Sequence, residues 1–191
     1  MKLSKPEFRA MQSLPRKLGQ RYFEMPLFKQ MGLNIKDKDV LEIGCGSGYG
    51  AYLLNQLEPK SYIGLDLMTE QVDLARKNYS QFQFLIQDAQ DLSQFPTASK
   101  DVVVIFGVLH HIPDWRKTMD EIARVLKPGG SLFLEEPRGV DIKFFDFFFR
   151  WGHPKVDFGL KALDAHLVKR GLNSIHKRWT PILTMYHLRK E

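Results

Sequence analysis

The sequence of 191 residues has one cysteine and no long hydrophobic run, and both features limit the classes of protein to which it can belong. The single cysteine, Cys45, excludes a disulfide framework and a zinc site built on several cysteines, so we expect no metal site and a cytoplasmic location. No apolar stretch reaches the length of a signal-peptide core or of a bilayer span, so we expect no transmembrane segment. Hydrophobic residues still make up 43% of the chain and charged residues 26%, as in a globular protein that buries a full core.

Excess negative charge is absent overall, but the net charge of +6 is unevenly spread. Residues 1–39 hold 9 basic and 4 acidic side chains, and residues 138–191 hold 11 basic and 5 acidic ones. Residues 40–137 reverse the balance, with 8 basic and 13 acidic side chains. The basic flanks leave contact with nucleic acid or with a membrane surface open, whereas the middle of the chain is an acidic module.

The acidic module alternates short apolar runs with helical patterns, which is typical of βα repeats and a parallel sheet. The nearly continuous apolar run at 101–106 indicates a central strand covered on both faces. After residue 137 the alternation changes, and 143–151 is strongly aromatic. The pattern predicts strands at 40–43, 62–65, 82–86, 101–106 and 131–135, helices at 49–57, 70–78, 115–127 and 158–170, and two antiparallel strands within 174–188.

A glycine-rich segment, EIGCGSG at 42–48, ends the first predicted strand and opens the first predicted helix. Glycines there permit a tight turn and close approach of the backbone to a ligand, and the helix N-terminus favours an anionic group. Asp66 ends the second strand, where its carboxylate can accept both hydroxyls of a ribose. Asp88 follows the third, where it can accept from an adenine amine while the Ala89 N–H reaches a ring nitrogen. Together they predict an adenosine site, although either aspartate alone could be a helix cap or a solvated loop residue.

Four blocks carry a family resemblance: VLEIGCGSGYGAYLL at 40–54, YIGLDLMTEQVDLARKN at 62–78, FQFLIQDAQDL at 82–92, and 101–137 with LHHIPDW and LKPGG. In this order they resemble the class I S-adenosylmethionine-dependent methyltransferases, most closely the branch with quinone-pathway and other small-molecule enzymes. The resemblance implies an α/β, Rossmann-like three-layer sandwich whose seven-stranded, mostly parallel sheet has an antiparallel last strand. It also implies a single domain over 1–191: an N-terminal helical extension (1–39), a cofactor-binding core (40–137), and an aromatic insertion with C-terminal helix and strands (138–191).

The resemblance also implies roles for the cofactor-binding residues. Glu42 would orient the methionine end of S-adenosylmethionine, and Asp66 would hold its ribose. Cys45 fills a variable loop position and is interpreted as small filler, not as a nucleophile. The full predicted set is Glu42, Gly44, Cys45, Gly46, Asp66, Leu67, Asp88, Ala89 and Phe106. A nicotinamide dinucleotide site is the alternative, since Gly46, Gly48 and Ala51 fit the looser G-x-G-x-x-G/A pattern, but it gives Asp88-Ala89 no role.

The acceptor side is less well marked in the sequence. His110 and His111 follow the fourth strand and are candidate general bases, or one of them bonds a loop carbonyl while the other is solvated. Glu135 and Glu136 end the fifth strand, where they bind substrate cations or cap the next segment. By position in the family, Tyr22 would close over the cofactor with Arg21 near its carboxylate. The candidate substrate residues are Tyr22, Glu135, Phe144 and Phe148.

These residues predict methyl transfer to a small-molecule acceptor that is hydrophobic or planar. The alternatives are a nucleic-acid or protein methyltransferase, and a cofactor-binding partner subunit without turnover of its own. No Asn/Asp-Pro-Pro-Tyr motif follows the fourth strand, which disfavours methylation of nucleic-acid amines. The aromatic run at 143–151 suggests an acceptor pocket, a helix packed on the sheet, a dimer contact or a membrane contact. A monomer and a homodimer both remain open.

Overall fold

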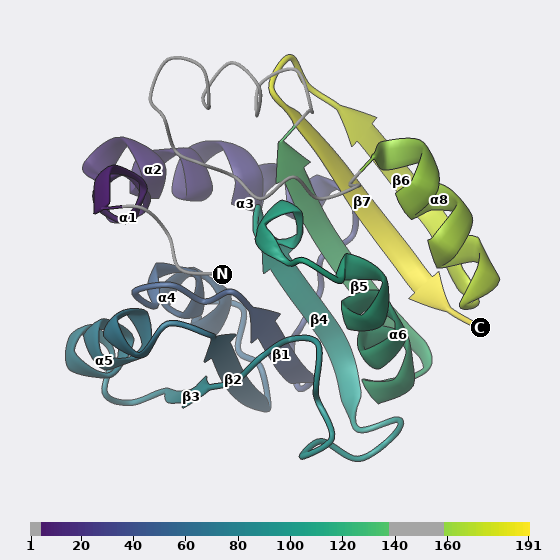
Figure 1. Cartoon of the computed structure of the whole chain (residues 1–191), viewed down its shortest axis with the longest axis horizontal. Helices are drawn as coiled ribbons and strands as arrows, with labels where there is room; N and C mark the ends of the chain where they lie inside the picture. The colour runs from purple at the N-terminus through teal and green to yellow at the C-terminus, as the bar shows by residue number, and fades with distance from the viewer. Residues whose placement is uncertain (1–4, 138–158) are drawn as a thin grey trace.

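The computed structural model describes residues 5–137 and 159–191. Its centre is a seven-stranded sheet with the strand order β3-β2-β1-β4-β5-β7-β6 (Figure 1). The strands are β1 (Asp39–Ile43), β2 (Ser61–Asp66), β3 (Gln83–Ile86), β4 (Lys100–Phe106), β5 (Leu126–Pro137), β6 (Leu172–Trp179) and β7 (Leu183–Lys190).

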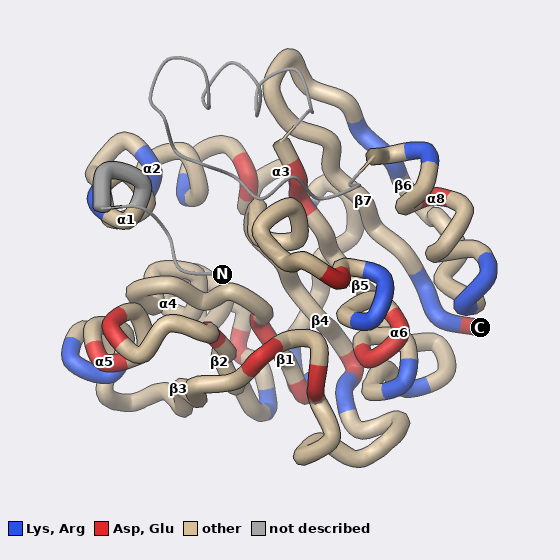
Figure 2. The backbone as a smooth tube through the Cα atoms, viewed as in Figure 1, with Lys and Arg blue, Asp and Glu red and all other residues tan. Residues whose placement is uncertain are grey.

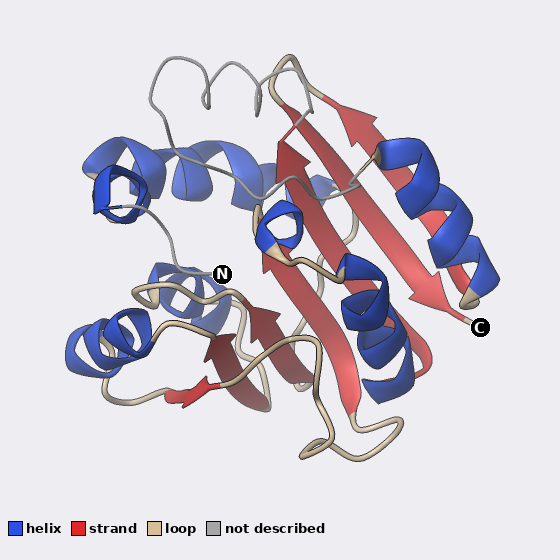
Figure 3. Cartoon of the chain, viewed as in Figure 1, coloured by secondary structure: helices blue, strands red, loops and turns tan. Residues whose placement is uncertain are grey.

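Helices cover both faces of the sheet, as Figure 3 shows. Apolar side chains of α3, α4 and α5 pack on one face, and those of α6 and α8 pack on the other. The helices are α1 (Lys5–Met11), α2 (Leu14–Gly19), the π-helical turn η1 (Gln20–Glu24), α3 (Met25–Gln30), α4 (Tyr49–Asn55), α5 (Thr69–Asn78), the 3-10 turn η2 (Leu109–His111), α6 (Trp115–Val125) and α8 (Leu160–Lys169). The fold is the expected three-layer α/β sandwich.

Strand β7 runs against its neighbours on both sides. It pairs antiparallel with β5, from Ser131 opposite Arg189 to Pro137 opposite Leu183, and antiparallel with β6. The pairs β1–β2, β1–β4, β2–β3 and β4–β5 are all parallel. The expected mostly parallel sheet with an antiparallel last strand is confirmed.

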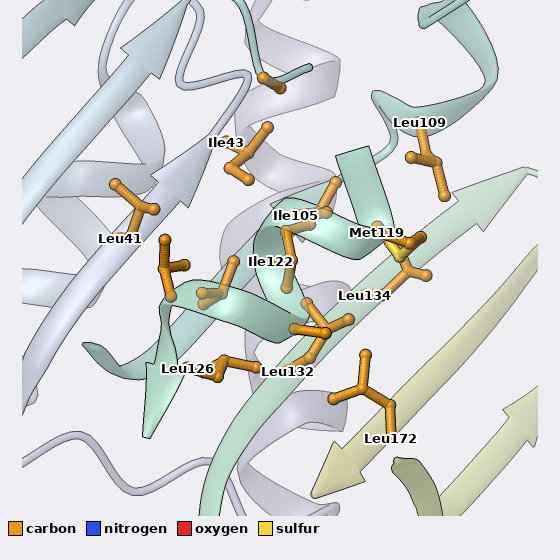
Figure 4. Close-up of a cluster of buried hydrophobic side chains, with 14 of the residues drawn as sticks. Leu41, Ile43, Ile105, Leu109, Met119, Ile122, Leu126, Leu132, Leu134 and Leu172 are labelled. Carbon is orange, nitrogen blue, oxygen red and sulfur yellow. The ribbon is translucent and has the colours of Figure 1, made fainter. Parts of the chain in front are cut away.

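The sheet has a hydrophobic core on each face because neighbouring residues of a strand point in opposite directions. Leu41 and Ile43 of β1 join Ile105 of β4 in the core under α6 and α8, shown in Figure 4. Val104 of β4 points the other way, into the core under α3, α4 and α5. The continuous apolar run of β4 therefore marks a strand buried on both faces, as expected.

One helix is shorter than its sequence pattern predicts. The helix expected over 115–127 ends at Val125, and Leu126 already has an extended backbone (φ −66°, ψ 135°). Pro128 disfavours a helical conformation at Lys127 and cannot donate a backbone hydrogen bond, so the chain leaves the helix before it. The Asp114 carboxylate caps the start of this helix by accepting from the Lys117 N–H (3.1 Å).

Figure 2 shows acidic residues near the strand ends between α4 and α6, and basic residues on α2, on β6 and at both ends of α8. No helix among residues 5–137 and 159–191 combines the length and the apolar character that crossing a membrane requires.

Candidate functional site

A cleft lies at the carboxyl ends of β1, β2 and β4 and is walled by α1 and α2. It encloses about 1080 Å³, including the space at its open mouth. In a parallel sheet this edge, next to the point where the strand order reverses between β1 and β4, is the usual ligand site. Lining residues at or just after the strand ends are Glu42, Gly44, Cys45, Gly46, Asp66, Leu67, Asp88, Ala89 and Phe106. Others come from α1, α2, η1 and the segment after β4: Met11, Arg16, Gln20, Val108, His111, Ile112 and Pro113. All nine predicted cofactor-binding residues line this one cleft.

Gly44 gives the first loop its tight turn. Its φ is +73°, in the region that favours glycine, and a Cβ placed there would lie 2.3 Å from Cγ2 of Val108. The N–H groups of Gly44 and Cys45 both donate to the Leu65 carbonyl at 2.8 Å, which ties the loop to the end of β2. Glycine is thus required both for the backbone angle and for the close approach of Val108.

Asp66 joins the end of β2 to the glycine loop. Its Oδ2 accepts from the Gly46 N–H (3.0 Å) and its Oδ1 from the Met68 N–H (2.9 Å). Burial raises the pKa of Asp66, while these backbone donors partly offset that effect. Because each carboxylate oxygen has two lone pairs, both oxygens can accept a second hydrogen bond from the cleft.

Glu42 is buried at the floor of the cleft. It accepts a hydrogen bond from the Tyr62 hydroxyl, and burial raises its pKa to about 8 despite that bond. Gly50, in the first turn of α4, makes room for this carboxyl, since a Cβ there would lie 2.1 Å from Glu42 Oε1. Sequence reasoning singled out Glu42 but missed Tyr62 and Gly50, both of which lie inside the quoted motifs.

Cys45 is part of the glycine-rich loop, and its side chain is buried. Burial raises the pKa of Cys45 well above its ordinary value, and Glu42 and Asp66 raise it further. A thiol held protonated in this way is a poor nucleophile.

Four more predicted residues line the cleft. The Asp88 carboxylate is held by the Gln90 backbone N–H (2.9 Å), beside the buried Ala89. Leu67 is 45% exposed, so its side chain is available to pack on a ligand at the mouth. Phe106 is buried against Phe28 of α3, with ring centroids 5.6 Å apart.

A second group of buried charges adjoins the cleft, and sequence reasoning recognised only one of its members. Arg16 of α2 pairs with Glu24 of η1 and lies 3.8 Å, Nη2 to Oε2, from Glu135 of β5. Burial would lower the pKa of Arg16, but the two carboxyls raise it. Burial raises the pKa of Glu24, and burial followed by the Glu24 charge raises that of Glu135 well above its ordinary value. One arginine between two buried carboxyls favours retention of a proton on the glutamate pair.

The two candidate histidines have different surroundings. His110 is buried, and its Nδ1 lies 2.7 Å from Glu136 Oε2, a carboxylate that also accepts from the Leu109 N–H (2.6 Å) and the His110 N–H (3.3 Å). Glu136 therefore fixes the start of η2. From the sequence we expected Glu136 to bind a substrate cation or to cap the next segment, and this arrangement is neither. His111 lines the cleft, with its ring centroid 4.0 Å from that of His110.

The candidate substrate residues are scattered. Glu135 lies beside Arg16, which lines the cleft, and Tyr22 is 68% exposed on η1; neither Glu135 nor Tyr22 is among the lining residues. Phe144 and Phe148, and with them the aromatic run at 143–151, lie outside the described residues. Within the described part of the chain, no group of three or more His, Cys, Asp or Glu side chains is placed to hold a metal ion.

Residues 41–134 match the family model described as a methyltransferase domain. A phthiotriol/phenolphthiotriol dimycocerosates methyltransferase of Mycobacterium leprae is 39% identical over 145 residues, 74% of this chain and 50% of the relative. A fatty-acid O-methyltransferase of Mycolicibacterium smegmatis is 38% identical over 108 residues, 55% of this chain and 39% of the relative. The chain thus spans half or less of the length of these relatives.

Solved structures share the whole architecture at low sequence identity. An S-adenosylmethionine-dependent methyltransferase from Aquifex aeolicus superposes with a TM-score of 0.76 at 16% identity, covering 100% of both chains. One from Mesorhizobium loti gives 0.75 at 15% identity, covering 87% of this chain and 97% of that one. At such identities the likeness is one of fold.

Proposed function

The chain belongs, through residues 41–134, to the class I S-adenosylmethionine-dependent methyltransferases, and from this we propose that it methylates a small, lipid-like acceptor. One observation carries the proposal: a single cleft is lined both by the acidic residues Glu42, Asp66 and Asp88 and by apolar side chains. The acidic residues suit a cationic sulfonium donor, and the apolar side chains suit a hydrophobic acceptor.

The residues of the cleft fit the cofactor. Gly44 lets the loop turn tightly against Val108 at the end of β1, and Asp66 has lone pairs left for two ribose hydroxyls. We assign Asp88 and Ala89 to the adenine edge, Leu67 to its face, and Glu42 to the methionine end. When bound, S-adenosylmethionine supplies an electrophilic methyl group on a positively charged sulfur.

The apolar side chains that line the cleft determine the acceptor class. We call the group of Met11, Phe106, Val108, Ile112 and Pro113 the apolar wall. The relatives named for fatty acid and for phthiotriol act, by their names, on lipid-like molecules. We therefore assign to this chain an acceptor with a long apolar portion and a single nucleophilic group directed into the cleft.

Methyl transfer needs alignment and exclusion of water, and a hydroxyl acceptor also needs a base. We assign the base to His111, which lines the cleft beside the apolar wall. His110 is a positioning residue, because its bond to Glu136 fixes the turn that carries His111. The Arg16, Glu24 and Glu135 group holds the wall formed by α2 against the end of β5.

The test is methyl transfer from S-adenosylmethionine to a panel of long-chain fatty acids, long-chain alcohols and alkylphenols, with RNA and protein as competing acceptors. We expect turnover on at least one lipid-like acceptor and none on RNA or protein. For a hydroxyl acceptor, His111→Gln should lower kcat by roughly 100-fold with cofactor affinity unchanged. His176→Gln, which changes an exposed histidine on β6, is the matched control and should have wild-type kcat.

Methylation confined to RNA or protein would overturn the assignment of the acceptor. Cofactor binding without turnover on any acceptor of the panel would instead favour a partner subunit that binds the cofactor. Equal kcat for His111→Gln and wild type on a hydroxyl acceptor would remove His111 as the base.

A further inference from the structure

The helical stretch formed by α2 and η1 is amphipathic, but it turns its polar side inward and its apolar side outward. Arg16, Gln20 and Glu24, four residues apart, form its inward polar side, and Arg16 and Gln20 line the cleft. Leu14, Leu18 and Tyr22 are also four residues apart, and all three are exposed, Leu14 at 67% and Tyr22 at 68%. A surface helix normally buries its apolar stripe, so this outward stripe requires a partner.

Basic side chains flank the stripe on one side. Lys17 and Arg21 lie one residue before Leu18 and Tyr22 in the sequence, and Figure 2 shows blue, basic segments at α2. The Lys17 Nζ lies over the Tyr49 ring of α4 at 5.6 Å, and the Arg21 guanidinium lies 5.5 Å from the Tyr22 ring. The acidic residue of this stretch, Glu24, is buried and paired with Arg16. The exposed charge beside the stripe is therefore positive.

A second exposed apolar group lies at the same edge of the sheet. Trp179 ends β6 and is 69% exposed, and Ile182 is exposed in the turn before β7. Because Leu183 pairs with Pro137 at the end of β5, this turn lies at the carboxyl edge, like the cleft. The Arg178 guanidinium donates to Gln30 Oε1 (2.8 Å), which connects the turn to α3 (Figure 1).

We propose that the stripe of Leu14, Leu18 and Tyr22, together with the Trp179–Ile182 turn, docks on an anionic lipid membrane surface. Aromatic rings with a polar atom suit the headgroup region, and the leucines suit the boundary with the acyl chains. Lys17, Arg21 and Arg178 attract anionic headgroups. The inward side of the same helical stretch lines the cleft, so docking sets the membrane against the outer side of that wall.

The positive charge of Lys17 and Arg21 favours a membrane over a second copy of the chain as the partner of the stripe. In a symmetric contact through this stripe, Lys17 and Arg21 of one copy would lie near the same cations of the other, which is unfavourable. An anionic surface turns the same charges into an attraction. The docking does not depend on which acceptor is methylated, so it is measured without cofactor or acceptor.

The test is co-sedimentation of the full chain with vesicles of phosphatidylcholine and of phosphatidylcholine mixed with phosphatidylglycerol. We expect binding to the anionic vesicles that weakens as salt is added. The pair Lys17→Glu and Arg21→Glu, and separately the pair Leu18→Ser and Tyr22→Ser, should each weaken vesicle binding at least about tenfold. The matched controls are Val168→Ser and Lys169→Glu at the end of α8, where Val168 is 66% exposed near the opposite edge of the sheet, and both should bind like wild type.

Circular dichroism and thermal melting establish that each variant is folded. Absence of wild-type binding to anionic vesicles would overturn the proposal, and so would equal weakening by the α8 controls. Sedimentation velocity without lipid supplies the other overturning result: a dimer that Leu18→Ser with Tyr22→Ser dissociates would assign the stripe to a second copy. Vesicle binding that persists when no acceptor is methylated would leave the docking intact and count against the proposed function alone.

Discussion

Two groups of buried carboxyls serve the cleft, and they are held in different ways. Glu42 and Asp66 are held by groups from the same motif segments: the Tyr62 hydroxyl and the N–H groups of Gly46 and Met68. Glu24 and Glu135 are held by Arg16, which reaches Glu135 across 119 positions of sequence. The first group is a local arrangement of strand ends, and the second joins the N-terminal helices to the far strand of the parallel sheet.

The different ways in which the two groups of carboxyls are held indicate two different roles. Hydrogen bonds from backbone and hydroxyl donors hold Glu42 and Asp66 in place, so among the described residues neither carboxyl needs an ion pair to fix its position. Arg16 instead compensates Glu24 and Glu135 within the protein, where they hold α2 and η1 in position. We infer that the first group binds ligand and the second builds the wall.

The largest effect should come from removing the cation of the second group. Arg16→Met leaves Glu24 and Glu135 buried without their arginine, and we expect a loss of about 3–5 kcal/mol in the free energy of unfolding. Urea denaturation measures it. Lys36→Met, which breaks the exposed pair with Glu58, is the control and should have little effect on the free energy of unfolding, because water screens exposed ion pairs. A loss for Arg16→Met no larger than the control's would show that the N-terminal helices are held by packing alone.

A pH effect distinguishes Glu42 from an exposed carboxyl. Its pKa is about 8 in the folded chain against an ordinary value of 4.5, so between these pH values the folded state binds more protons than the unfolded state. Stability contributed by the protonated carboxyl is complete below pH 4.5 and is lost as pH rises toward 8, at up to about 1.4 kcal/mol per pH unit.

Glu42→Gln removes this titration and keeps an acceptor for Tyr62. The difference in unfolding free energy between Glu42→Gln and wild type should therefore shift in favour of the variant from pH 5 to pH 8. Denaturation curves at several pH values measure the shift. A constant difference across that range would mean that the Glu42 pKa is not raised.

The smallest of these effects should appear at the glycine loop. Gly44→Ala places a Cβ 2.3 Å from Val108 at a φ of +73°, and we expect it to cost about 3 kcal/mol of stability. Gly129→Ala is a close control, because Gly129 has a φ of +77° and no atom within 4 Å of the added Cβ. It should cost about 1 kcal/mol, and thermal or urea unfolding compares the two. Equal losses would mean that Val108 moves aside freely.

Much of the fold, and the gathering of the candidate residues in one cleft, could be predicted because both depend on local patterns. The βα alternation and the continuous apolar run of β4 indicate the sheet, and Glu42, Asp66 and Asp88 lie at or just after the ends of recognisable strands. Parallel strand ends meet at one edge, so residues far apart in sequence are brought together by the fold class itself.

The wall of the cleft could not be predicted in the same way. No sequence motif around Glu24 indicates that its carboxyl is buried, and its partners come from α2 and β5. The available signal was the four-residue spacing of Arg16, Gln20 and Glu24, which sets a polar stripe against the apolar one of Leu14, Leu18 and Tyr22. Deciding which stripe faces inward required the packing of the helix on the sheet.

The central claim, that the locally held carboxyls form the cofactor site, is tested most directly by calorimetric titration of Asp66→Ala with S-adenosylmethionine. We expect the dissociation constant to rise roughly 100-fold, because two charge-assisted hydrogen bonds to hydroxyls are lost. Asp73→Ala, an exposed aspartate of α5, should bind like wild type. Equal affinities for Asp66→Ala and Asp73→Ala would contradict the account.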